Sequence, residues 1–294
     1  MGSEKEIMEK IRRIGKDNIS GASELAWRAS EVLVEGESSG EMDLYALCME
    51  LLGQQPSMAP IINLVSSALH SLDEQGALTP FCSEFSRRIN KNRTIIAESG
   101  AELILDGYLV ATHSSSSTVR EALKTARERN REFRVLCSEG RPVNEGTKMA
   151  EYLHRSGVDV TIMTDAMLMD RVADADILIV GADSISPAGL VNKVGTRSAA
   201  MRAKEEDTGV ISLCSMDKFL PRKNVGHSYI KGDPKEVYRG GLPIKVINEY
   251  FDLTPLGLID LVITEAGSLD KDGVEIECGK VRLHDMIMEA LELD

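Results

Sequence analysis

Hydrophobic positions in the first third of the chain recur at the three- and four-residue spacing of amphipathic helices. These helical runs are 24–34, 41–52, 61–72 and 80–104. Two breaks rich in small and polar residues, 20–23 and 55–60, separate some of them, and each can leave backbone N–H groups free at a helix start. The pattern predicts a compact helical N-terminal domain over residues 1–105.

The pattern changes after residue 106, where short apolar runs begin to alternate with helical ones. The apolar runs are 108–111, 133–136, 158–163, 177–180, 210–213 and 261–263, and the helical runs among them are 118–129, 144–154, 166–172 and 196–206. Strands joined through single helices favour right-handed crossovers and a parallel sheet covered on both faces. The sequence therefore predicts an α/β protein, in which a Rossmann-like parallel-sheet domain (106–294) follows the helical N-terminal domain.

Composition and charge exclude several classes of function. The chain has 294 residues, 43% of them hydrophobic, and a formal net charge of −13, which disfavours direct binding of nucleic acid. The five cysteines are scattered without metal spacing, which indicates reduced thiols in a cytoplasm. The first 16 residues are rich in charged side chains and lack the apolar core of a secretory signal. No apolar run is long enough to span a membrane. We therefore expect a cytoplasmic protein without a membrane partner, a bound metal or a cofactor.

Polar side chains follow nearly every predicted strand. The residues of interest are His113, Ser114, Ser115, Ser116, Arg141, Asp183, Asn192, Lys193 and Lys218. Asn192 and Lys193 are expected in a polar loop between the strand 177–180 and the helix that begins near Thr196. The carboxyl ends of parallel strands meet at one edge of a sheet, where α/β proteins bind their ligands. Each residue taken alone has an ordinary alternative, such as a turn cap, a surface ion pair or a structural histidine. Together they predict a crevice for a polar, phosphorylated small molecule, although no Gly-x-Gly-x-x-Gly or Walker sequence indicates a standard nucleotide site.

Two of these features suit a phosphate. The serine run 114–117 leads directly into a helix, where hydroxyls and unpaired N–H groups form a cradle for an anion. Arg141 can hold a phosphate through two parallel hydrogen bonds. His113 can transfer a proton near neutral pH.

The series of motifs resembles one superfamily. It comprises the alpha, beta and delta subunits of translation initiation factor two-B, methylthioribose-1-phosphate isomerase and archaeal ribose-1,5-bisphosphate isomerase. The matching segments, in chain order, are Thr112-His113, Ser138-Glu139-Gly140-Arg141-Pro142, Ala182-Asp183-Ser184, Asn192-Lys193-Val194-Gly195-Thr196, Asp217-Lys218-Phe219, Phe251-Asp252-Leu253-Thr254-Pro255 and Thr264-Glu265-Ala266-Gly267. The resemblance spans nearly the whole chain and implies a helical domain before a Rossmann-like one.

The resemblance also assigns candidate roles. In the isomerases, an aspartate and a cysteine move hydrogen between two sugar carbons; the aspartate is similar to Asp183, whereas Ser114 stands in place of the cysteine. Two arginine positions of the isomerase pattern are Ser20 and Gln55 here, so each loses a charge-assisted phosphate contact. Cys137 is a candidate replacement thiol, with a buried structural role as its alternative. The resemblance and the strand ends together give ligand-binding candidates at Gly21, Ala22, His113, Ser115, Ser116, Arg141, Asn192, Lys193 and Lys218.

Three hypotheses follow. The first is a regulatory or non-catalytic relative of the initiation-factor subunits that binds a phosphosugar or nucleotide, and the altered positions favour it. The alternative is an aldose–ketose isomerase acting on ribose-1,5-bisphosphate or methylthioribose-1-phosphate. A generic Rossmann-like binding module is disfavoured by the ordered motifs. The resemblance further implies a homodimer or higher oligomer, with translation initiation factor two as a candidate partner.

Overall fold

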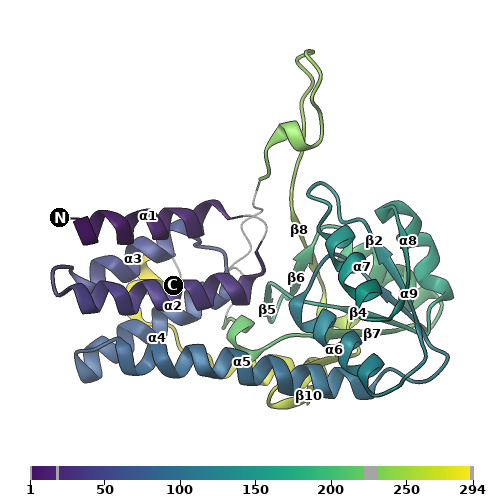
Figure 1. Ribbon diagram of the computed structural model, residues 1–294, viewed down its shortest axis with the longest axis horizontal. Helices are drawn as coiled ribbons and strands as arrows, with labels where there is room; N and C mark the ends of the chain where they lie inside the picture. The colour runs from purple at the N-terminus through teal and green to yellow at the C-terminus, as the bar shows by residue number, and fades with distance from the viewer. Residues whose placement is uncertain (1, 18–19, 222–230, 292–294) are drawn as a thin grey trace.

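The computed structural model describes residues 2–17, 20–221 and 231–291, and the chain within them forms a helical part and an α/β part (Figure 1). The helical part contains α1 (Gly2–Lys16), α2 (Ala22–Ser39), α3 (Leu44–Gln54), α4 (Ala59–Gln75) and α5 (Thr79–Glu102). Local signals set several ends: Asp43 caps α3 by accepting from the N–H groups of Tyr45 and Ala46, and left-handed Gly76 ends α4. The prediction of a helical N-terminal part is confirmed.

Helix α5 belongs to both parts of the molecule. Its first half, including Phe85, packs in the core of the helical part, and its second half, including Ile96 and Ala101, packs in the core under the sheet. The C-terminal helix α11 (Asp285–Ala290) returns to the helical part, where Ile287 is fully buried. Helix α5 therefore contributes to the cores of both parts, and the C-terminal end of the chain packs in the core of the helical part.

The main sheet has the strand order of a doubly wound fold. It contains β1 (Leu109–Thr112), β2 (Arg134–Ser138), β3 (Asp159–Met163), β4 (Ile177–Val180), β7 (Gly209–Leu213), β9 (Leu261–Thr264) and β10 (Gly267–Leu269), in the order β10-β9-β7-β4-β1-β2-β3. Every pairing is parallel except that of β10 with β9. The associated helices are α6 (Ser117–Glu128), α7 (Glu145–Arg155), α8 (Asp165–Arg171), α9 (Thr196–Glu205) and α10 (Lys271–Lys280). The α/β prediction is confirmed, with the antiparallel edge strand β10 as an addition.

The topology fixes where a ligand can bind. The chain builds β1, β2 and β3 outward in one direction and then crosses back to place β4 on the other side of β1. The loops that follow β1 and β4 therefore diverge to opposite faces of the sheet and leave a crevice between them.

A second, smaller sheet corrects one sequence prediction. Strands β5 (Ser184–Ser186), β6 (Gly189–Lys193) and β8 (Phe251–Thr254) pair in antiparallel fashion. Asn192 and Lys193 thus lie on a buried strand, although the sequence predicted a polar loop. No apolar run marks this sheet in the sequence, because several of its buried residues are serine, asparagine and lysine.

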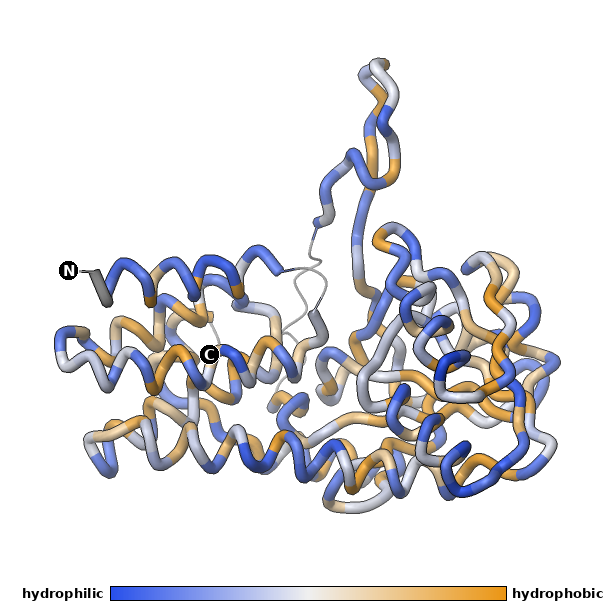
Figure 2. The backbone as a smooth tube through the Cα atoms, viewed as in Figure 1, coloured by the Kyte–Doolittle hydropathy of each residue, from blue (hydrophilic) through white to orange (hydrophobic). Residues whose placement is uncertain are grey.

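Residues 231–250 form an arm that projects away from the α/β part (Figure 1). Its base is held by hydrogen bonds from Asn248 and Tyr250 to the Glu236 carboxylate, at 2.8 and 2.7 Å. Its outer portion carries exposed apolar side chains, including Leu242 and Ile247, and Figure 2 shows hydrophobic segments along it. None of the predicted strands or helices falls in this segment.

Candidate functional site

The loops after β1 and β4 lead to opposite faces of the sheet but approach each other closely at one point of the crevice. A Cβ atom at Gly181, directly after β4, would lie 2.6 Å from the Ser116 hydroxyl oxygen, so only glycine permits this approach. Ser114, directly after His113, adopts a left-handed backbone conformation with φ 69°. Such a conformation is costly for a serine and is typical of residues held in place at binding sites.

Between these loops lies a cavity of about 100 Å³, which we call the inner cavity. It is bounded by the start of α2, the loop before α6, the loop after β4 and strand β6. Its lining residues are Ser20, Gly21, Ala22, Ser23, Ser114, Ser115, Ser116, Ser117, Val143, Glu145, Gly181, Ala182, Asp183, Asn192, Lys193, Lys218 and Phe251. The helical and α/β parts of the chain therefore both contribute to it.

Asp183 lines the inner cavity as a half-buried side chain. Burial raises the pKa of its carboxyl, Lys218 and Lys193 oppose that rise, and the negative charge of Glu145 adds to it. A carboxyl with a raised pKa is suited to give or take a proton.

The two buried lysines of the cavity are held in different ways. Lys218 donates from Nζ to the carbonyl of Ala182 at 2.5 Å. Lys193 Nζ lies 2.8 Å from Glu145 Oε1 and 5.3 Å from the ring centre of Tyr250. Both ammonium groups are thus fixed at the wall of the cavity, where they can bind ligand oxygens.

Glu145 is the central acceptor of the site. Its Oε1 accepts a hydrogen bond from Ser114 Oγ at 2.8 Å in addition to the contact with Lys193, whereas its Oε2 is buried without a partner among the described residues. An unsatisfied buried carboxylate oxygen is rare and marks a position that a ligand hydroxyl can satisfy.

Two helix starts point toward the cavity. Helix α2 begins at Ala22, and its N-cap Gly21 supplies no side-chain hydrogen bond. Helix α6 is capped by Ser116, whose hydroxyl accepts from Val119 N. The N–H groups of a first helical turn favour an anion, as the sequence predicted for both segments.

The structure brings most of the sequence-predicted residues together. Nine of them line the inner cavity: Gly21, Ala22, Ser114, Ser115, Ser116, Asp183, Asn192, Lys193 and Lys218. The second break, 55–60, serves another purpose, because Gln55 donates from Nε2 to the carbonyls of Ile14 and Gly15. It closes the end of α1 and does not line the cavity.

His113 and Arg141 lie outside the cavity lining. The His113 side chain is fully buried, with Nδ1 2.7 Å from Ser138 Oγ and Nε2 2.9 Å from the Val194 carbonyl. The Arg141 guanidinium instead donates to the carbonyl of Glu236 at the base of the arm, at 2.9 Å. His113 thus links the end of β2 to the segment after β6, and Arg141 holds the base of the arm.

No thiol reaches the inner cavity. All five cysteines are buried, and burial raises the pKa of each thiol to about 12. Cys137, the candidate replacement thiol, contacts the carbonyls of Ser138 and Gly146 at 3.5 Å each. A thiol with so high a pKa is a poor proton donor or acceptor at neutral pH.

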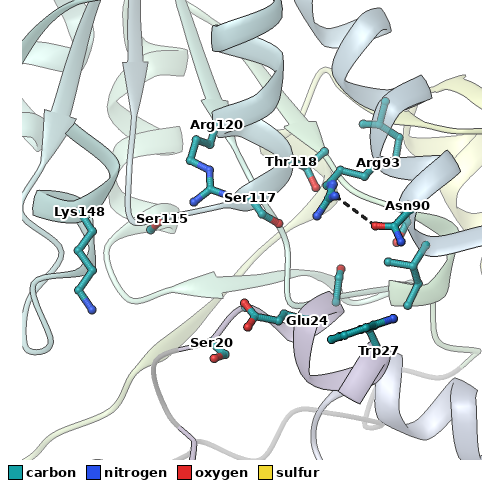
Figure 3. A pocket seen from close by; sticks show the side chains of 15 residues that line it. Ser20, Glu24, Trp27, Asn90, Arg93, Ser115, Ser117, Thr118, Arg120 and Lys148 are labelled. Carbon is teal, nitrogen blue, oxygen red and sulfur yellow. Dashed lines mark hydrogen bonds between the residues drawn. The ribbon is translucent and has the colours of Figure 1, made fainter. Parts of the chain in front are cut away.

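A larger, more open cavity of about 460 Å³ adjoins the inner one, and we call it the outer cavity (Figure 3). The two share Ser20, Gly21, Ser23, Ser115 and Ser117. Three cations line the outer cavity, Arg93 from α5, Arg120 from α6 and Lys148 from α7, with Trp27 of α2 on the opposite wall.

Sequence reasoning missed Glu145 and these three cations. Glu145 lies in the first turn of α7, where an acidic residue is ordinary, so no signal distinguished it. Arg120 did carry a signal, because a cation one turn from a helix start opposes the helix dipole. Arg93 and Lys148 sit on exposed faces of amphipathic helices, where cations are common.

Comparison with known proteins identifies relatives over most of the chain. Residues 18–271 match the model of the Initiation factor 2 subunit family. A putative translation initiation factor eIF-2B subunit 2-like protein from Pyrococcus horikoshii is 33% identical over 267 residues, covering 89% of this chain and 95% of the relative. A ribose 1,5-bisphosphate isomerase from Methanocaldococcus jannaschii is 30% identical over 289 residues, covering 92% of each chain.

Solved structures agree on the fold. The crystal structure of a Pyrococcus horikoshii translation initiation factor eIF-2B superposes with a TM-score of 0.81 at 32% identity, covering 90% of this chain and 96% of that one. A 5-methylthioribose 1-phosphate isomerase from the same organism superposes with a TM-score of 0.72 at 18% identity, covering 97% of this chain and 88% of that one, and shares the fold. Within the described residues, no helix is both long and apolar enough to cross a membrane.

Proposed function

Because the chain belongs to the initiation factor 2 subunit family, whose relatives include ribose 1,5-bisphosphate isomerases, we propose that it binds a phosphorylated sugar in the inner cavity. The observation that carries this proposal is the convergence of Asp183, Lys193 and Lys218 with two helix starts in one cavity. Lysines and free N–H groups attract phosphate oxygens, and carboxylates accept from sugar hydroxyls.

We further propose that the role is regulatory rather than catalytic. The family cysteine is replaced by Ser114, whose hydroxyl is already bonded to Glu145, and each of the five thiols is buried. An unactivated alcohol is a much poorer acid than a thiol. The acid–base pair implied by the resemblance is therefore incomplete, whereas the binding features of the site are present.

Ligand-dependent thermal unfolding tests this proposal. Ribose 5-phosphate or ribose 1,5-bisphosphate should raise the melting temperature of the wild type, because a ligand that binds only the folded state stabilises it. Lys193→Ala and Asp183→Ala should reduce that rise, whereas Asp170→Ala, on an exposed face of α8, should leave it unchanged. Equal rises in all four proteins would place binding elsewhere.

An aldose–ketose isomerase is the second candidate. It is favoured by Asp183, whose raised pKa suits proton transfer, and by the neighbouring Ser114–Glu145 contact. Purified protein should then convert ribose 1,5-bisphosphate or methylthioribose 1-phosphate to the ketose, and Asp183→Asn should abolish turnover. Binding without turnover would favour the regulatory role.

The proposed setting is a cytoplasmic homodimer or higher oligomer, with translation initiation factor two as a candidate partner and no direct contact with nucleic acid or membrane. The net charge of −13 supports the last point. Co-purification of the tagged chain with translation initiation factor two, compared with and without phosphosugar, tests the partner.

A further inference from the structure

The outer cavity opens beside the inner one, and its charge differs from that of its neighbour. In the inner cavity, Lys193 is neutralised by Glu145, and Lys218 shares its surroundings with Asp183. The carboxylate that lines the outer cavity, Glu24, forms an ion pair with Arg28, and within the described residues neither Lys148 nor Arg93 has a carboxylate within ion-pair distance. Arg93 donates to the amide oxygen of Asn90, at 3.1 Å (Figure 3).

Arg120 carries a buried N–H group without a hydrogen bond. Its Nε is buried and has no hydrogen-bond partner among the described residues, and the nearest carboxylate oxygen, Glu121 Oε1, is 3.6 Å away. Its guanidinium lies over the ring of Tyr152, 4.4 Å from the ring centre, which fixes its position. A buried guanidinium N–H without an acceptor costs free energy that an anion would recover.

The N-terminus of α6 also favours an anion in the outer cavity. Ser117 and Thr118 are the first two residues of a 12-residue helix, so their N–H groups have no acceptor within the helix, and both residues line the outer cavity. Arg120 stands one turn further along, where its charge opposes the helix dipole. A bound anion would be favoured by both the dipole and the guanidinium, and would remove their mutual repulsion.

We propose that the outer cavity is an anion subsite that holds the phosphate group of the ligand between Arg120, Arg93 and Lys148. This proposal rests on the proposed function. One ligand can reach both cavities, because Ser115, Ser117 and the residues before and at the start of α2 line both of them. The hydroxylated part of the sugar then lies in the inner cavity beside Asp183 and Glu145, whose oxygens accept from hydroxyls. The ligand class is a sugar phosphorylated at the end remote from Asp183.

Calorimetric titration of ribose 5-phosphate and of inorganic phosphate tests the subsite. Arg120→Gln and Lys148→Gln should each weaken binding of ribose 5-phosphate about tenfold or more, since a charge-assisted hydrogen bond contributes at least that factor. Arg120→Lys should restore part of the loss. Lys124→Gln, on the same helix and outside both cavities, should bind like the wild type.

The outcomes separate the two proposals. Wild-type affinity in the Arg120 and Lys148 variants, with loss of binding in Lys193→Ala, would overturn the subsite and leave phosphosugar binding in place. If the wild type binds no phosphosugar, the proposed function fails, and the subsite is then judged by inorganic phosphate. Phosphate should bind the wild type and not the Arg93→Gln, Arg120→Gln, Lys148→Gln triple variant; equal binding, or none to the wild type, would overturn the subsite.

Discussion

Asp183 shows at the scale of one residue how a candidate site opposes stability. Burial desolvates its carboxyl, and two nearby lysines only partly compensate. Natural sites commonly retain such groups because function requires the chemistry, while the rest of the fold supplies the stability.

Replacing Asp183 should therefore stabilise the unliganded protein at neutral pH. Because the folded state raises the carboxyl pKa above its ordinary value of 3.8, the folded chain binds this proton more tightly than the unfolded chain. The free energy of unfolding then falls as pH rises from about that value through the raised pKa. Asp183→Asn removes the ionisation, so its melting temperature should exceed that of the wild type by a few degrees at pH 7, with a smaller difference near pH 4.

Thermal unfolding monitored by circular dichroism between pH 4 and pH 8 measures this difference. Asp170→Asn provides the control, since that side chain is exposed on α8. A wild type more stable than Asp183→Asn at pH 7 would show that the ionised carboxylate is favourable in the folded state, contrary to the argument.

The position of single residues could be predicted from the sequence where the signal is local. Asp183 and the serine run follow apolar strands directly, and the position of a strand end can be read from where apolar residues stop. His113 also follows a strand, but both its ring nitrogens are used in contacts with Ser138 and Val194, which are distant in sequence. Such contacts leave no local pattern, so the sequence could not distinguish a site histidine from a structural one.

At the scale of elements, the site depends on how closely α7 approaches β2. Gly146, in the first turn of α7, lies against the end of β2, and a Cβ atom there would be 1.9 Å from the Ser138 carbonyl oxygen. Glu145 precedes this glycine and reaches the inner cavity because of the close approach. The sequence predicted the helix within a residue or two at each end, yet this steric requirement comes from a strand eight residues earlier.

Gly146→Ala should thus displace α7 and with it Glu145. We expect a loss of about 1–3 kcal/mol in the free energy of unfolding, the usual cost of overpacking, because a backbone carbonyl cannot move aside as a side chain can. The ligand-induced rise in melting temperature should fall as well. Chemical denaturation, with and without phosphosugar, measures both effects.

Gly279→Ala is the matched control. Gly279 also lies in a helix, α10, but a Cβ atom there meets nothing within 4 Å. This change should stabilise the protein by about 0.5–1 kcal/mol, since alanine favours the helix over glycine. If Gly146→Ala behaved in the same way, α7 would not be held against β2 as the structure shows.

At the scale of the whole molecule, the alternation of strands and helices was sufficient to predict the Rossmann-like class. It could not give the strand order, because right-handed crossovers fix the hand of each connection and not the side on which the next strand is placed. The return of α11 to the helical part could not be predicted either, since its N-cap His284 bonds to Ser66 and Asp73, more than 200 residues earlier in the chain. Contacts of this separation are set by global packing.

The projecting arm leads to the last prediction. Leu242, Ile244 and Ile247 are 68, 56 and 74% exposed, although burying one such side chain fully is worth about 1.5–3 kcal/mol. Clustered exposed apolar side chains on a projecting segment are typical of an interaction surface. In the proposed homo-oligomer, a second copy of the chain would cover these side chains. We expect the wild type to be a dimer or larger, and Leu242→Ser combined with Ile247→Ser to shift it toward monomer.

Sedimentation velocity at several micromolar concentrations tests this, with Ile276→Ser as the control. Ile276 is 61% exposed but lies on α10, away from the arm, so its loss should leave the oligomer intact. The double variant should also keep the wild-type circular dichroism spectrum, because neither arm residue belongs to a buried core. A wild type that sediments as a monomer, or a double variant that remains associated, would mean that the apolar arm does not join two copies of the chain.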